Sequence, residues 1–357
     1  MNNEKKRLLW IDTSKGIAIL FVVIGHMIPM TSKFSIWFYS FHVPIFFMIS
    51  GVLIQYSSMT LHNISAKDII TNKAKALLYP YFVFSLLSVV KIFITDGIRG
   101  VGDGIVNTLL FNGIDTLWFL PSLFIAELLF LFLKKYTNNN FFILSIYAVA
   151  FVVTSIFSYY CYGIYDSIDY ILIILLRILK EMNRALIGSI FVCIGYYSYA
   201  ILKKMSSKML YLCCVFLISM FISFGIFFAF YNIADLHYSI IGNPIVYYVA
   251  AIAGSYFVFS FSMLISYIEK YIKCNILTYW GKNSLIIFLT HLNLGITLIS
   301  KKLSFFNICQ TIQSIVIIMV IETVLVLIIN KWFPFLIDYK SACKLFGNCI
   351  KKVRGNK

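Results

Sequence analysis

The feature that most constrains this chain is a series of long apolar segments along almost its whole length. Windows of about 19 residues place ten of them at 16–31, 36–56, 76–95, 116–133, 141–160, 185–202, 209–231, 245–268, 283–300 and 310–333. Most are close to the ~20 residues that a helix needs to cross a bilayer. Of the 357 residues, 61% are hydrophobic and only 12% are charged, which excludes a soluble globular domain and a disordered chain. The sequence therefore predicts an all-α, polytopic membrane protein with about ten transmembrane helices.

The basic residues indicate how these helices are oriented. With a cytoplasmic N-terminus, 21 of the 30 Lys and Arg residues fall on the cytoplasmic side, where positive charge accumulates in membrane proteins. Both termini are then cytoplasmic, and topology explains most of the net charge of +16, so we expect no nucleic-acid partner. We divide the chain into an integral-membrane domain, residues 1–335, and a short basic cytoplasmic tail, residues 336–357, which we expect to contact anionic membrane lipids.

Two apolar stretches fit this plan poorly. Residues 168–179 are apolar for only about 12 residues, a length that favours an interfacial or re-entrant helix. Residues 104–112 are similar and shorter. The number of spans can therefore differ from ten by one pair.

Ionisable side chains inside the first span are the first functional signal, because such groups are costly in a membrane. Lys15 and His26 are 11 residues apart, which returns a helix to within about 20° of the same face after a rise of ~16 Å. Asp12 lies one turn before Lys15 and can reach it. Gly25, beside His26, leaves room for another group to approach the imidazole.

Further ionisable residues lie in other spans. His42 is followed by Pro44, which interrupts a helix and can leave the imidazole facing a cavity. His291, Glu127 and Glu322 lie within later spans. Any one of them can be a polar residue that holds helices together, but together they suggest a polar layer in which an imidazole acts as a general base and a carboxylate orients it. The spacing of these residues supports neither a metal site nor a nucleotide-binding loop.

Several phrases of the sequence are similar to those of a known family. LLWIDTSKGIAILFVVIGHMIP (8–29), followed by FHVPIFFMISGVLI (41–54), resembles the opening of the integral-membrane acyltransferase 3 family. KAKALLYPYFVF (73–84), DTLWFLPSLFIAEL (115–128) and SLIIFLTHL (284–292) resemble later segments of that family, in the same order. The resemblance is strongest to the branch of fucose 4-O-acetylases and other surface-glycan O-acetyltransferases.

The resemblance implies an activity and partners. It implies an O-acetyltransferase that moves an acetyl group from cytoplasmic acetyl-CoA to a sugar hydroxyl of a cell-surface polysaccharide or its lipid-linked precursor, in a bacterial inner membrane and without a metal. Four aromatic residues expected near the outer face are candidate sugar-stacking surfaces: Trp37, Tyr39, Trp118 and Tyr165. The alternatives are a non-enzymatic polysaccharide export or transport protein on the same ten-helix plan, and a membrane scaffold or sensor in which the polar layer is structural.

The resemblance also implies which residues bind the donor. Lys15 matches the basic residue of the family's first helix. Lys73 and Lys75 match a basic pair that is often arginine in the related branch, a change that keeps charge but loses bidentate geometry. We expect these three lysines to neutralise the phosphates of acetyl-CoA.

The resemblance also implies four candidate catalytic residues. His26 matches the histidine of the family's first helix, and we expect it to remove the proton from the acceptor hydroxyl. We expect Glu127 or His42 to orient the imidazole of His26. His291 is the fourth candidate catalytic residue. Direct transfer and an acetyl-histidine intermediate are both open.

Overall fold

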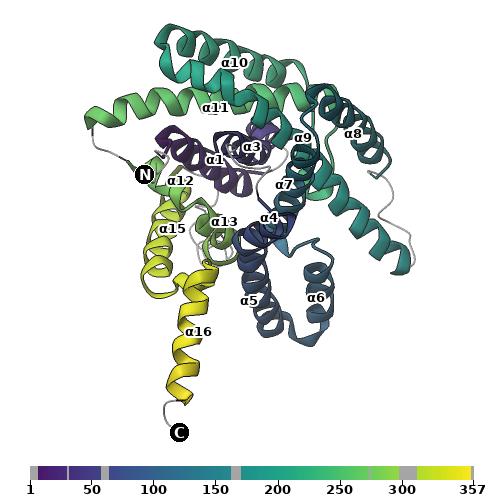
Figure 1. Ribbon diagram of the computed structural model, residues 1–357, viewed down its shortest axis with the longest axis vertical. Helices are drawn as coiled ribbons and strands as arrows, with labels where there is room; N and C mark the ends of the chain where they lie inside the picture. The colour runs from purple at the N-terminus through teal and green to yellow at the C-terminus, as the bar shows by residue number, and fades with distance from the viewer. Residues whose placement is uncertain are drawn as a thin grey trace.

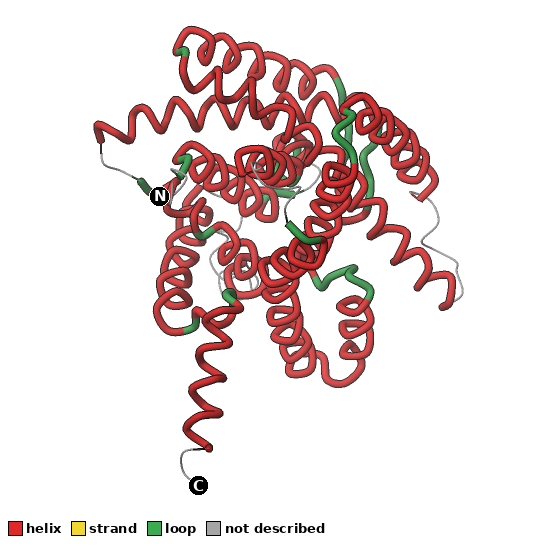
Figure 2. The backbone as a smooth tube through the Cα atoms, in the orientation of Figure 1, coloured by secondary structure: helices red, strands yellow, loops and turns green. Residues whose placement is uncertain are grey.

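The computed structural model describes residues 7–29, 32–57, 64–161, 170–272, 275–296 and 312–354. This part of the chain is helical, with short connections and no strand (Figure 2). The α-helices are α1 (Leu9–Met27), α2 (Lys33–Phe41), α3 (Pro44–Ser57), α4 (Ala66–Lys73), α5 (Tyr79–Asp96), α6 (Val101–Leu109), α7 (Phe119–Tyr136), α8 (Asn140–Cys161), α9 (Tyr170–Ser207), α10 (Met209–Ala229), α11 (Pro244–Ile272), α12 (Ile276–Lys282), α13 (Ser284–Thr290), α15 (Ile312–Trp332) and α16 (Tyr339–Arg354). The π-helical turns are η2 (Ala74–Leu78) and η6 (His291–Ile296), and the 3₁₀ turns are η3 (Gly97–Gly100), η4 (Asp115–Trp118), η5 (Leu236–Tyr238) and η8 (Pro334–Leu336).

The predicted all-α membrane architecture is confirmed. Within the described residues, nine helical segments are long and apolar enough to cross a membrane, and each overlaps one of the predicted segments. The remaining predicted segment, 283–300, contains α13 and η6 and then continues into residues outside the described part. The basic tail expected from residue 336 contains helix α16, which extends away from the other helices in Figure 1.

The stretch 168–179 differs from the expectation of a short re-entrant helix. From Tyr170 onward it is the first part of α9, which continues to Ser207 as one helix of 38 residues. At 1.5 Å per residue this helix is about 57 Å long, well beyond the ~30 Å hydrocarbon core of a bilayer. The short apolar run and the long one that follows it therefore belong to one continuous helix, which is longer than a bilayer core is thick.

Helices α1 and α3 lie near the middle of the molecule, and glycines let their neighbours approach closely (Figure 1). A Cβ at Gly16 of α1 would lie 2.0 Å from the carbonyl oxygen of Leu277 in α12. A Cβ at Gly195 of α9 would lie 2.1 Å from the carbonyl oxygen of Met48 in α3. In membranes, small residues let backbones pack at such short range. The central helices are thus held at fixed separations, which positions their polar side chains.

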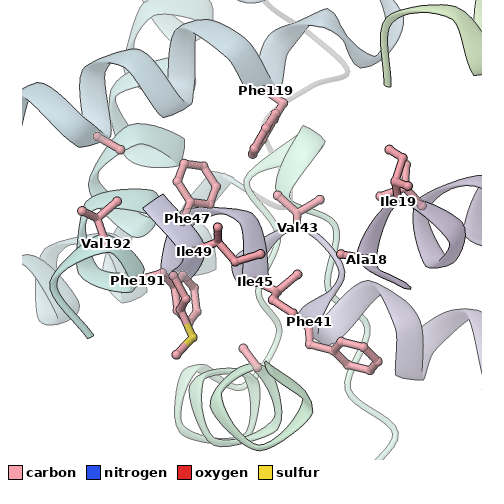
Figure 3. Close-up of a cluster of buried hydrophobic side chains, with 14 of the residues drawn as sticks. Ala18, Ile19, Phe41, Val43, Ile45, Phe47, Ile49, Phe119, Phe191 and Val192 are labelled. Carbon is pink, nitrogen blue, oxygen red and sulfur yellow. The ribbon is translucent and has the colours of Figure 1, made fainter. Parts of the chain in front are cut away.

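One face of α3 packs in an apolar core. Ile45, Phe47 and Ile49 are buried and lie in one cluster with Phe119 at the start of α7 and Phe191 of α9 (Figure 3). Phe47 and Phe119 make an edge-on ring contact with centroids 5.2 Å apart. Packing of this kind fixes the relative positions of α3, α7 and α9.

The helix break expected at Pro44 is present. Helix α2 ends at Phe41 and α3 begins at Pro44, so His42 lies in the connection between them. Proline has no N–H to donate to the preceding turn, which is why the helix cannot run through this position unbroken.

Candidate functional site

Two predicted histidines meet at the C-terminal end of α1. His26 lies in the last turn of α1, and His291 begins the π-helical turn η6. Their ring centroids are 5.3 Å apart. π-Helical turns are rare and frequently found at functional sites. The fold thus brings together two imidazoles that are far apart in the sequence.

The hydrogen bonds of His291 define the tautomer of its neutral ring. Its side chain is 0% exposed, and its Nδ1 lies 3.0 Å from the carbonyl oxygen of Ile287 and 2.9 Å from that of Phe288. Carbonyl oxygens only accept hydrogen bonds, so Nδ1 carries the proton and donates it. Nε2 is left as an acceptor, buried and without a hydrogen-bond partner among the described residues. Buried acceptors in proteins usually have a hydrogen-bond partner, and a proton-donating group of a bound substrate would supply one for Nε2.

Tyr39 connects His26 to the third predicted histidine. The Tyr39 ring centroid lies 6.3 Å from that of His26 and 4.7 Å from that of His42. His42 is buried, with Nδ1 2.7 Å from the carbonyl oxygen of Phe38. A Cβ at Gly25 would lie 3.2 Å from the Tyr39 ring, so the room expected beside His26 is filled by this tyrosine. The rings of His291, His26, Tyr39 and His42 form a continuous row, which we call the histidine row.

A carboxylate supports the histidine row from α15. Glu322 is 0% exposed and accepts a hydrogen bond from the hydroxyl of Thr290, the residue directly before His291. The sequence identifies Glu322 as an acid within a span but not as part of the catalytic set. Its contact with Thr290 depends on the packing of α15 against α13, which no local pattern records.

Two of the predicted donor-binding lysines line a cavity of about 530 Å³. Lys15, Lys73 and Glu127 are its charged side chains, and most of the remaining lining is apolar. The Lys73 Nζ lies 2.9 Å from Glu127 Oε2, and the hydroxyl of Ser50 donates to Glu127 Oε1. Glu127 therefore lies with Lys73 and Ser50 in this cavity, while the ring contacts of His26 are to His291 and Tyr39.

The expected pairing of Asp12 with Lys15 is wrong, because Asp12 pairs with Arg7. Both carboxylate oxygens of Asp12 accept from Arg7, at 2.6 Å from Nε and 3.0 Å from Nη2. This pairing holds the pKa of the Arg7 guanidinium above its ordinary value, because the carboxylate stabilises the charge. In the described part of the chain, Lys15 has no carboxylate within 4.0 Å. Its ammonium is thus available to an anion in the cavity.

Lys75 points to a different neighbour. Its Nζ lies 5.2 Å from the ring centroid of Tyr339, at the start of α16, and it does not line the cavity. Tyr79 in the same region donates a hydrogen bond to the carbonyl of Phe335. The chain near the predicted basic pair is therefore joined to the C-terminal helix, and only Lys73 of the pair reaches the cavity.

A second polar cluster, which the sequence did not single out as a site, lies in α9. Arg184 is 1% exposed and Glu181 is 2% exposed. The Arg184 Nη2 lies 2.6 Å from Glu181 Oε2 and 2.9 Å from Asn112 Oδ1, and Nη1 lies 3.2 Å from the carbonyl oxygen of His237. Ser122 donates to Glu181 Oε1 at 2.8 Å. We call these five residues the arginine cluster. The signal in the sequence was a Glu and an Arg three residues apart beside an apolar run.

Aromatic and acidic residues complete this region. The guanidinium of Arg184 lies 5.0 Å from the Trp118 ring centroid, and the His237 ring is stacked on Trp118 at 5.9 Å. Trp118 is thus covered by protein groups, unlike the sugar platform expected of it. Burial and the charge of Arg184 lower the pKa of His237 to about 3. Burial raises the pKa of Asp235 to about 6, although the backbone N–H of His237 donates to it.

Comparison with known proteins gives one match. A family model described as an acyltransferase domain matches residues 8–331. No curated protein and no solved structure matches the chain. Across the described residues, no three His, Cys, Asp or Glu side chains are placed to hold a metal ion.

Proposed function

The chain belongs to the integral-membrane acyltransferase 3 family, and from that premise we propose that it is an O-acetyltransferase. The donor in this proposal is cytoplasmic acetyl-CoA. The acceptor is a sugar hydroxyl of a cell-surface polysaccharide or its lipid-linked precursor, and the setting is a bacterial inner membrane. The family match and the long apolar helices establish that the chain is a multi-pass membrane acyltransferase.

One observation carries the proposal: helix α1 joins a cavity lined by cations to a row of histidines. Lys15 lines the cavity, and His26 lies 11 residues further along the same helix, a rise of ~16 Å. A volume of about 530 Å³ is within the ~300–1,000 Å³ usual for small-molecule sites. Ammonium groups of Lys15 and Lys73 suit the phosphates of a coenzyme, and the apolar lining suits an extended arm that leads toward the histidine row.

The chemistry assigned to the histidine row is proton transfer. His26 is half-buried and accepts the proton of the sugar hydroxyl, while the hydroxyl oxygen attacks the thioester carbonyl. The carbon–sulfur bond breaks, and the thiolate leaves with the proton that His26 returns. His291, whose Nδ1–H is held by backbone carbonyls, keeps Nε2 as an acceptor, and its ring centroid lies 5.3 Å from that of His26. Both direct transfer and an acetyl-histidine intermediate fit this arrangement.

The test of the proposal is the replacement of His26. Because a positioned general base contributes ~10²–10⁴-fold, His26→Ala should lower acetyl transfer by at least ~100-fold. Cells carrying the wild type, His26→Ala or no copy of the gene are compared for O-acetyl signals in NMR spectra of their surface glycans. Expression is matched, and thermal unfolding of the purified variant checks the fold.

The rival function predicts the opposite result. A non-enzymatic export protein tolerates loss of His26 and leaves glycan acetylation independent of the gene. Wild-type acetylation by the His26→Ala variant, at equal expression, would remove the central assignment.

A further inference from the structure

The ion pair inside the cavity brings a cation and an anion together where an anionic substrate is proposed to bind. Lys73 Nζ lies 2.9 Å from Glu127 Oε2, with side chains that are 31% and 7% exposed. Both residues line the cavity, as does Lys15. The Lys73 ammonium is thus already occupied by a carboxylate that belongs to the protein.

The two members of the pair differ in how firmly they are held. Glu127 is a buried residue of α7, and its other oxygen accepts a hydrogen bond from Ser50 of α3. Lys73 is the last residue of α4 and is followed directly by the π-helical turn η2. Its ammonium ends a flexible four-carbon stem. The lysine can therefore turn away from Glu127, while the carboxylate stays in place.

The charge of the cavity depends on this carboxylate. The charged side chains of the lining are Lys15, Lys73 and Glu127, which sum to one positive charge. Without the charge of Glu127 the sum is two positive charges, and an incoming phosphate meets neither a competitor for Lys73 nor a like charge nearby. Glu127 thus weakens the binding of any anion at Lys73.

We propose that Glu127 stands in for a donor phosphate on Lys73 when the cavity is empty, and that donor binding exchanges one anion for the other. The inference rests on the proposed donor and adds a residue that sets its affinity. Lys15, which has no carboxylate within 4.0 Å among the described residues, makes the first contact with the phosphate. Lys73 then leaves Glu127 and completes the binding. After product release, the pair forms again and keeps Lys73 from holding CoA.

The exchange is tested by CoA binding to the purified, full-length protein in nanodiscs, measured by calorimetry. Glu127→Gln keeps an acceptor for Ser50 but removes the charge. We expect it to bind CoA about three- to tenfold more tightly, tenfold being ~1.4 kcal/mol. In the Lys73→Gln background, the same change should tighten CoA binding clearly less than in the wild type, because it then relieves only the repulsion between Glu127 and the phosphate and frees no lysine.

A matched control separates a local effect from a change in net charge. Glu269→Gln also removes one negative charge, but Glu269 lies on α11, accepts from Thr278 and does not line the cavity. It should leave CoA affinity unchanged. Equal tightening by Glu269→Gln and Glu127→Gln would overturn the exchange in favour of a general charge effect.

The remaining outcomes distinguish this inference from the proposed function. Unchanged or weaker CoA binding by Glu127→Gln overturns the exchange, while dependence on Lys15 and Lys73 would still support the donor site. No CoA binding by the wild-type protein overturns both. A loss of kcat in Glu127→Gln with unchanged CoA affinity would return Glu127 to a role in orienting the catalytic base.

Discussion

Two pairs of a glutamate with a basic residue lie in the described part of the molecule, and their surroundings differ. The Lys73–Glu127 pair borders a cavity of about 530 Å³, with side chains 31% and 7% exposed. The Arg184–Glu181 pair, at 2.6 Å, has side chains only 0% and 3% exposed. Arg184 also binds Asn112 and the backbone of His237, whereas Lys73 ends a short helix. The first pair can open for a ligand, and the second holds segments together.

The difference shows what a charge pair inside a membrane protein can do. A lysine beside a cavity can exchange partners, because water or a ligand compensates its charge while it moves. A buried guanidinium has no such compensation, so breaking its pair leaves an uncompensated charge in a low-dielectric interior. Of the two, only the pair beside the cavity is suited to a step that repeats at every turnover.

The largest expected effect is on stability, and it separates the two pairs directly. Arg184→Gln should lower the free energy of unfolding by ~3–5 kcal/mol, because Glu181 is left buried without its cation. Lys73→Gln should cost less than ~1 kcal/mol, because its ammonium is partly exposed. Both are measured by denaturant unfolding in the same detergent. Adding Glu181→Gln to Arg184→Gln should recover part of the loss. Similar losses for the two single variants would mean that the pairs do not differ in kind.

A smaller effect is expected from Asp235, next to the arginine cluster. Its pKa is raised from 3.8 to about 6, so its ionised form opposes folding and its contribution to stability falls as the pH rises through 6. Asp235→Asn keeps an acceptor for the His237 N–H and should stabilise the protein by about 2 to 3 kcal/mol above pH 7, at 1.36 kcal/mol per pKa unit.

The pH series provides the control for this prediction. The pKa of His237 is lowered to about 3, so its contribution to the stability of the folded protein falls as the pH drops below 6.5. This contribution is the same in the wild type and in Asp235→Asn, and it cancels in their difference. The advantage of Asp235→Asn should therefore shrink between pH 7.5 and pH 5. A variant less stable than the wild type at pH 7.5 contradicts the expectation.

The smallest expected effect is kinetic and belongs to the cavity. Because a hydrogen bond to a charged group contributes ~1.5–3 kcal/mol, Lys15→Met should raise the KM for acetyl-CoA about tenfold or more. The KM for the acceptor should stay close to that of the wild type. Steady-state kinetics with each substrate varied in turn gives both values. A rise for the acceptor alone would argue against a phosphate at Lys15.

Local patterns predicted much of the fold and part of the site. The break before Pro44 and the membrane helices follow from short stretches of sequence, since proline lacks an N–H and a spanning helix needs only length and apolarity. The alignment of Lys15 with His26 follows from the helical repeat alone. The sequence did not predict the long helix α9, because charged residues between 180 and 184 divide it into two apolar runs. A window of fixed length treats these runs as separate segments.

The sequence by itself determined an all-α membrane protein, with ionisable residues inside its spans and cations on the first helix. Only the tertiary structure decided which of those residues meet: His26 with His291, and Lys73 with Glu127. The physical reason is that hydrophobic burial depends on composition and period, which are local, while a charge pairs with whatever group the packing of distant helices brings within a few ångströms. In this protein, glycines such as Gly16 and Gly195 set that packing.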